Sequence, residues 1–178
     1  AAPGEPARAI GRGEAVARAA ETPMIILNAP LLAQRLGYAE LSGLDLLELF
    51  AFVHPARFMV PTPKGLAAAL GLDAPKDDVS AAAMLLGAAS ALLSHLGRPD
   101  WPEREGAWAS AASLARLRWP WAATVSERIS KPSRDERWLF SRLPEWQEAA
   151  ARPAPRPILL DTDDVLTRLD SLTGHGAE

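Results

Sequence analysis

A short apolar run at residues 24–27 is the feature that most constrains the fold of this chain. Its sequence, Met-Ile-Ile-Leu, has the length and β-branching of a buried strand, and it breaks at Asn28-Ala29-Pro30. Helix-like segments follow at residues 31–36, 44–53 and 77–96. A buried strand that alternates with helices predicts an α/β fold rich in helix.

Composition places the chain among globular proteins and narrows the classes of function. Its 178 residues are 48% hydrophobic and 23% charged, and no apolar run approaches the roughly 20 residues of a membrane span. Cysteine is absent, which leaves no disulfide and no thiolate metal site, so we expect a cytoplasmic protein without a membrane partner. Because the net charge is −3, any binding to nucleic acid needs a local basic patch.

Two acidic residues interrupt the apolar segment 44–53, which reads as a buried helix. Asp45 and Glu48 lie three residues apart on one helical face, where they suit either a bound cation or contact with solvent or an arginine; we favour the second. Further along, Thr62-Pro63 predicts the start of a short helix, and Asp77 and Asp78 predict caps for the long helix that follows.

Other polar residues are assigned to helix ends or turns. We expect Asn28 to cap a turn or helix, and His54, His95 and His175 lack both the spacing of metal ligands and neighbouring acids. His54 and His95 lie at predicted helix ends and are expected to interact with the last carbonyls of those helices. The acidic run at residues 161–164 resembles the start of a metal loop, but helix capping fits it better. No metal site is predicted.

The six tryptophans all lie beyond Pro99, which suggests a change of organisation there. We predict three parts: an α/β domain at residues 1–99, a Trp-rich helical extension at 100–151, and a Pro-rich linker with a short strand and helix at 152–178.

A basic stretch within the extension is the best candidate for a binding site. Single-stranded nucleic acid is bound by arginine on phosphates and by aromatic rings stacked under bases. The alternative is that the tryptophans pack the helices and the arginines form a solvated rim. The candidate residues are Arg116, Arg118, Trp119, Trp121, Arg128, Lys131, Arg134 and Arg137.

Three segments, residues 24–32, then 44–50 with 65–72, then 77–96, resemble in order the second half of DnaQ-like 3′–5′ exonucleases. In active members the first segment carries an aspartate where Leu32 stands here, and the third carries a histidine and an aspartate that this chain lacks. The resemblance therefore implies a degenerate exonuclease (RNase H-like) fold with no catalytic residue.

A second resemblance covers residues 41–58, 136–146 and 169–178, which look like the N-terminal region of bacterial DinG-like helicases, of the XPD-like type. It implies a non-catalytic accessory domain in DNA repair or replication, with a motor domain in the same polypeptide as its partner and single-stranded DNA as a further candidate. ATP and Mg would belong to that motor, because this chain contains no G-x-x-x-x-G-K-[ST] motif and is expected to hold no cofactor. The alternative is a free-standing protein–protein interaction module.

Overall fold

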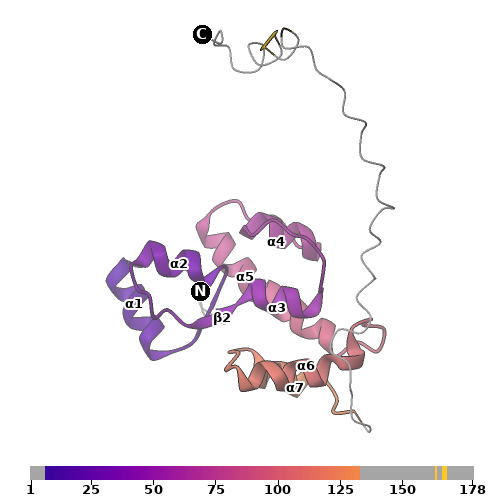
Figure 1. Cartoon of the computed structure of the whole chain (residues 1–178). Helices are drawn as coiled ribbons and strands as arrows, with labels where there is room; N and C mark the ends of the chain where they lie inside the picture. Colours follow the sequence, from indigo (N-terminus) through magenta and orange to yellow (C-terminus); the bar gives the residue numbers. More distant parts are fainter. Residues whose placement is uncertain (1–6, 133–162, 164–165, 168–178) are drawn as a thin grey trace. The chain divides into compact units, whose positions relative to one another are not determined.

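The computed structural model describes residues 7–132, 163 and 166–167. Within residues 7–132 it contains seven helices and one two-stranded parallel sheet, so the prediction of a helix-rich α/β fold is confirmed. The elements are α1 (Arg12–Glu21), β1 (Met24–Ile26), α2 (Ala29–Leu36), β2 (Gly43–Asp45), α3 (Leu46–Val53), α4 (Pro63–Leu70), α5 (Asp78–Leu96), α6 (Arg104–Arg116) and α7 (Ala122–Arg128) (Figure 1).

The sheet is a single β1–α2–β2 unit in which the connecting helix returns the chain to a parallel strand. Met24 pairs with Gly43 and Ile26 pairs with Asp45. A Cβ added at Gly43 would lie 2.7 Å from the Met24 carbonyl oxygen, so the strands can approach this closely only with glycine there. The strand predicted at residues 24–27 is confirmed, whereas the helix expected from residue 44 begins at Leu46, after β2.

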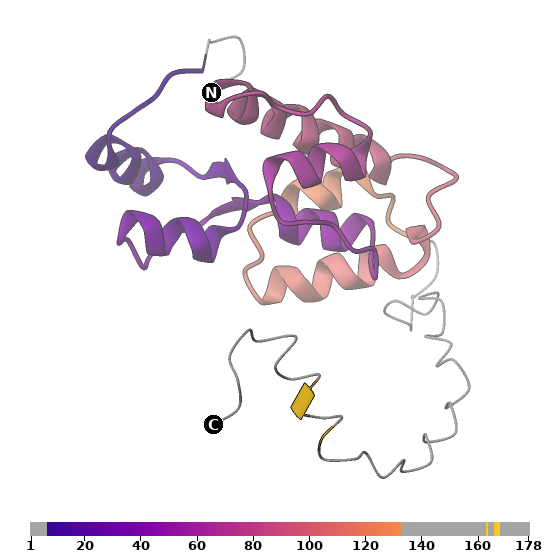
Figure 2. The same ribbon diagram turned by 90° about the horizontal axis from the view of Figure 1, so that it is seen from above.

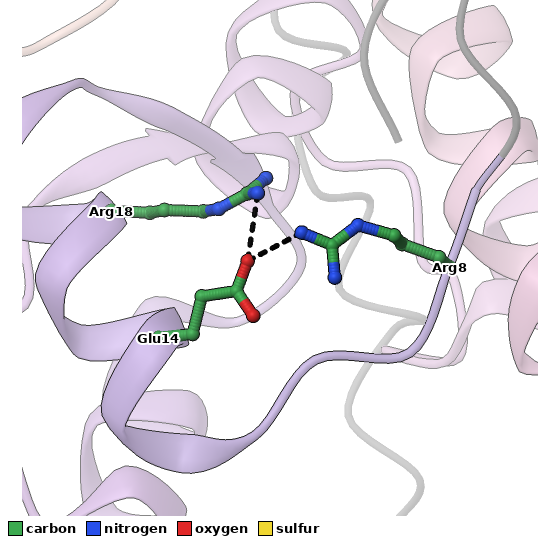
Figure 3. A network of polar contacts seen from close by, with 3 residues as sticks. All are labelled: Arg8, Glu14 and Arg18. Atoms are coloured by element: carbon green, nitrogen blue, oxygen red, sulfur yellow. Dashed lines mark hydrogen bonds and ion pairs between the residues drawn. The ribbon is translucent and has the colours of Figure 1, made fainter.

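Residues 7–10, before α1, form no strand. Arg8 instead reaches α1, where its guanidinium donates to Glu14 Oε1, and Arg18 lies 2.8 Å from the same oxygen (Figure 3). The hydrogen bond from Arg8 is the main cause that lowers the pKa of the Glu14 carboxyl. This exposed network ties the segment before α1 to the first turn of the helix.

Local capping signals are confirmed at three helices. Asn28 Oδ1 accepts from Leu31 N at 3.1 Å at the start of α2, and Thr62 Oγ1 accepts from Gly65 N at 3.1 Å at the start of α4. At α5 the Asp77 carboxylate accepts from Ser80 N at 2.7 Å, while Ser80 Oγ accepts from Asp77 N at 3.0 Å. This reciprocal pair is a capping box that fixes the first turn of the longest helix.

Helix α5 runs through the core and contacts α3, α4, α7 and β1. Among the described residues it is the one helix long and apolar enough to cross a membrane, a property not expected from the sequence. Ala88, Ala89, Leu92 and Leu96 are buried in the core, and the other residues of the helix are partly or fully exposed.

The core includes residues from both sides of the boundary expected near residue 100. Trp101 and Trp121 are buried in the same cluster as Leu49 of α3 and Leu92 of α5. The β1–α2–β2 unit lies at one end of helices α3–α7 (Figures 1 and 2). Packing thus continues across residue 100 within the described residues. The predicted linker, strand and helix at 152–178 lie outside the described residues, except Asp163, Leu166 and Thr167.

Candidate nucleic-acid interface

The predicted basic residues are divided between the two ends of a helical hairpin. Helices α6 and α7 pack against each other, with Arg116 and Arg118 at the turn that joins them (Figure 1). Arg128 is in the last turn of α7, and Lys131 follows it and lines a pocket with the residues before α6. The turn and the end of α7 are therefore separate basic surfaces. Arg134 and Arg137 lie outside the described residues.

The arginine turn, residues 116–119, presents two exposed guanidinium groups. Arg116 Nη2 donates to Ser113 Oγ at 3.0 Å, and no ion pair to Arg116 or Arg118 occurs among the residues that the structure describes. Leu117, between them, is 78% exposed. Arg118 has a φ of 62°, a left-handed conformation that is uncommon for a residue other than glycine. Such conformations persist where the surroundings impose them, and they cluster at functional sites.

Trp119 closes the arginine turn and is half-buried. Its Nε1 donates to Glu48 Oε2 at 3.0 Å, and its ring lies 5.1 Å from the ring of Phe52, centroid to centroid. Burial raises the pKa of Glu48, and the hydrogen bond from Trp119 opposes that shift. The ring is therefore held at the edge of the core with part of its surface open to solvent.

Trp121 differs from Trp119 because it is only 1% exposed. Its Nε1 donates to the carbonyl oxygen of Asp45 at 2.8 Å, and Trp101 makes the matching bond to the carbonyl oxygen of Val53 at 2.9 Å. Trp121, Trp119 and Trp101 thus bind α3 at its start, in its first turn and at its last residue, respectively. No base can stack on Trp121 while it is packed in this way, so the structure assigns that residue to the core and removes it from the predicted interface.

No arginine among the described residues forms an ion pair with the Asp45 carboxylate. Its carboxylate accepts from the backbone N–H groups of Asn28 at 3.1 Å, Ala29 at 2.6 Å and Leu47 at 2.9 Å. A single buried carboxylate therefore caps the starts of both α2 and α3, where N–H groups lack partners within the helix. The expectation that Asp45 meets solvent or an arginine is wrong, because its side chain is buried and its partners are backbone amides brought together by the sheet.

His54 and His95 lie at the ends of α3 and α5, as expected, but their described side-chain contacts are between rings. The two ring centroids are 4.9 Å apart, and Phe50 lies 5.1 Å from His54. Burial, reinforced by His95 and Arg57, lowers the pKa of His54 to about 4, and burial also lowers the pKa of His95. Across the described residues, no three His, Asp or Glu side chains gather closely enough to hold a metal ion.

Sequence reasoning missed the contacts that orient the interface. Glu48 and Trp119 are 71 residues apart, and Asp45 and Trp121 are 76 apart, so no local pattern links them. The basic character of the turn, by contrast, is visible in the sequence. Compared with known proteins, this chain matches no family model, no curated protein and no solved structure.

Proposed function

We propose that this chain is a non-catalytic accessory domain that contacts single-stranded DNA through the arginine turn. The observation that carries the proposal is the pair of exposed guanidinium groups of Arg116 and Arg118 beside the half-buried ring of Trp119. Arginine releases counterions when it contacts phosphate, and a partly open aromatic ring accepts a base edge or face. The pairing of Trp119 with Glu48 fixes the ring before any ligand arrives, which reduces the entropic cost of binding.

The larger setting of the proposal is an ATP-dependent helicase of DinG-like type, acting in DNA repair or replication. Its support is the resemblance of residues 41–58, 136–146 and 169–178 to the region before the motor in that family. The parallel β1–α2–β2 unit is compatible with a degenerate exonuclease-like fold, which we propose on the same basis. In this setting ATP and Mg are bound by the motor, and this domain helps to place DNA or packs on the motor.

A protein–protein interaction module is the second candidate, and exposed Leu117 favours it. A leucine that is 78% exposed between two arginines resembles the apolar centre and polar rim of a small docking surface. The two candidates differ in their response to salt. Phosphate contacts weaken steeply as salt rises, whereas burial of Leu117 in a partner does not.

Fluorescence anisotropy with labelled oligothymidine tests the DNA contact. The double variant R116A/R118A should bind about tenfold more weakly at low salt. The slope of log affinity against log salt should fall by about 1.4, because each single-strand phosphate contact contributes about 0.7. R35A is the matched control, since Arg35 is exposed in the last turn of α2, away from the turn. Equal binding by the double variant and the wild type would reject the arginine turn, and no binding by the wild type would favour the interaction module.

The size of the native polypeptide tests the helicase setting separately. An immunoblot of source-cell lysate with antibody against this chain should give a band far above 19 kDa. A band near 19 kDa would overturn the helicase assignment while leaving the DNA contact to be judged by anisotropy.

A further inference from the structure

The loop between α3 and α4 presents an aromatic ring to solvent. We call residues 55–62 the Phe58 loop. Phe58 is 85% exposed, the largest exposure of any large hydrophobic side chain among the described residues, and Val60 is 51% exposed. Met59, between them, packs against the core. The alternation of outward and inward side chains is that of an extended segment whose outer face carries Phe58 and Val60.

Several contacts fix this loop in place. Arg57 Nη2 donates to the carbonyl oxygen of Ala69 on α4 at 2.9 Å, and Thr62 N donates to the carbonyl oxygen of Val60 at 2.7 Å. A Cβ added at Gly65 would lie 2.2 Å from the Val60 carbonyl oxygen, so the loop rests directly on the first turn of α4. Because the backbone is tethered on both sides of Phe58, the ring is held outward by the fold.

The chain segment that contains Phe58 has a positive net charge. Arg57 and Lys64 are both exposed, and residues 49–72 contain no aspartate or glutamate, although the whole chain has 22 acidic residues. A ring in a basic segment that contains no acidic residue is complementary to a polyanion that also has flat apolar groups. Single-stranded nucleic acid has both. A protein partner fits less well, because the centre of a protein interface is depleted of charge and needs a larger apolar patch.

We propose that Phe58 is a stacking platform for a base of single-stranded nucleic acid and that Lys64 and Arg57 contact the adjacent phosphates. This inference rests on the proposed function and adds a second contact point to it. Trp121 joins the hairpin turn to the start of α3, and the Phe58 loop follows the end of α3. Eight helical residues span about 12 Å, so about that length of α3 separates the end that Trp121 contacts from the start of the Phe58 loop.

The test is anisotropy with the same labelled oligothymidine and the variants F58A, F58W and K64A. F58A should weaken binding about 5- to 100-fold without changing the salt slope, because stacking is not an ionic contact. F58W should bind as well as the wild type or better. K64A should lower the salt slope by about 0.7. V79A is the control, since Val79 is 51% exposed on α5 and lies outside the loop.

The outcomes separate this inference from the proposed function. If F58A binds like the wild type while R116A/R118A binds weakly, the Phe58 platform is rejected and the arginine turn stands. If F58A binds weakly while R116A/R118A is unchanged, the platform is supported and the arginine turn is rejected. If the wild type does not bind, both are rejected, and the exposed ring is assigned to a protein contact. Thermal melting of F58A should match that of the wild type, because the ring is mostly exposed.

Discussion

Asp45 and Asp77 each cap a helix, but their surroundings are opposite. Asp77 is exposed, and both of its capping contacts are with Ser80, three residues along the chain. Asp45 is 3% exposed, and its carboxylate joins the starts of two helices that belong to different parts of the chain. The first cap therefore organises one helical turn, whereas the second helps to hold the β1–α2–β2 unit against α3.

The two sites also differ in what replaces a lost hydrogen bond. Water can reach the N–H groups at the start of α5 if Asp77 is removed. Loss of Asp45 instead leaves partly buried N–H groups at the starts of α2 and α3 without their acceptor, and Trp121 packs nearby through its bond to the Asp45 carbonyl oxygen. Identical chemistry thus has a small consequence in solvent and a large one in the core, because a buried unsatisfied donor keeps the full cost of its desolvation.

The largest effect is expected from D45A, which removes the acceptor of three backbone N–H groups. We expect it to lower the free energy of unfolding by about 3–5 kcal/mol, since each unsatisfied buried donor costs about 1–3 kcal/mol. D45N should lose less, because one oxygen remains. Urea unfolding followed by circular dichroism measures both. Ordinary surface substitutions change the free energy of unfolding by less than about 1 kcal/mol. A loss of that size or smaller in D45A would therefore contradict the double-cap role.

The second-largest effect is expected from W121F, which tests whether the start of α3 depends on Trp121. W121F keeps an aromatic ring but leaves the Asp45 carbonyl oxygen without its donor, so we expect a loss of about 1–3 kcal/mol. W101F removes the equivalent bond to Val53 at the other end of α3 and should cost a similar amount. Chemical denaturation of the two variants side by side would distinguish them. If only W101F were destabilised, α3 would be anchored mainly at its end.

Sequence patterns predict the capping contacts between residues close together in the chain, and they miss the contacts between residues far apart in it. The contacts of Asp77 with Ser80, Thr62 with Gly65 and Asn28 with Leu31 span three residues each, and residue type and spacing are sufficient to predict them. The contact of Asp45 with Asn28 spans 17 residues and depends on strand register. It could not be predicted from spacing within one helix.

The tryptophans show the same limit at the candidate site. Their clustering in sequence suggested a separate extension, but clustering does not reveal which surface a side chain packs against. Trp101 and Trp121 donate to backbone oxygens of α3, so they belong to the core of the preceding segment. Arg116 and Arg118 are exposed, which both interpretations of the basic stretch, phosphate contact and solvated rim, require.

Lowering the pH is expected to destabilise the end of α3, where His54 lies, without any mutation. The lowered pKa values of His54 and His95 mean that the unfolded chain binds more protons than the folded chain as pH falls below about 6.5. The stability that the neutral rings contribute is complete above that pH and is lost as pH falls toward the folded pKa of His54, about 4. H54Q should flatten this dependence between pH 6.5 and 4 in urea unfolding. An unchanged profile would mean that carboxylates, such as those of Asp77 and Asp100, dominate it.

The smallest effect is expected from D77A, the exposed counterpart of D45A. The hydrogen bond from Ser80 N lowers the pKa of the Asp77 carboxyl, so the cap is charged at neutral pH and lies at the positive end of the α5 dipole. Its removal should lower the melting temperature by only about 2–4 °C, because water replaces the lost contacts. Differential scanning calorimetry of D77A and S80A together would test this, since each breaks one half of the capping box. A D77A loss as large as that of D45A would mean that exposure does not govern the cost of a lost cap in this fold, and the contrast between the two aspartates would then have to come from the helices they start.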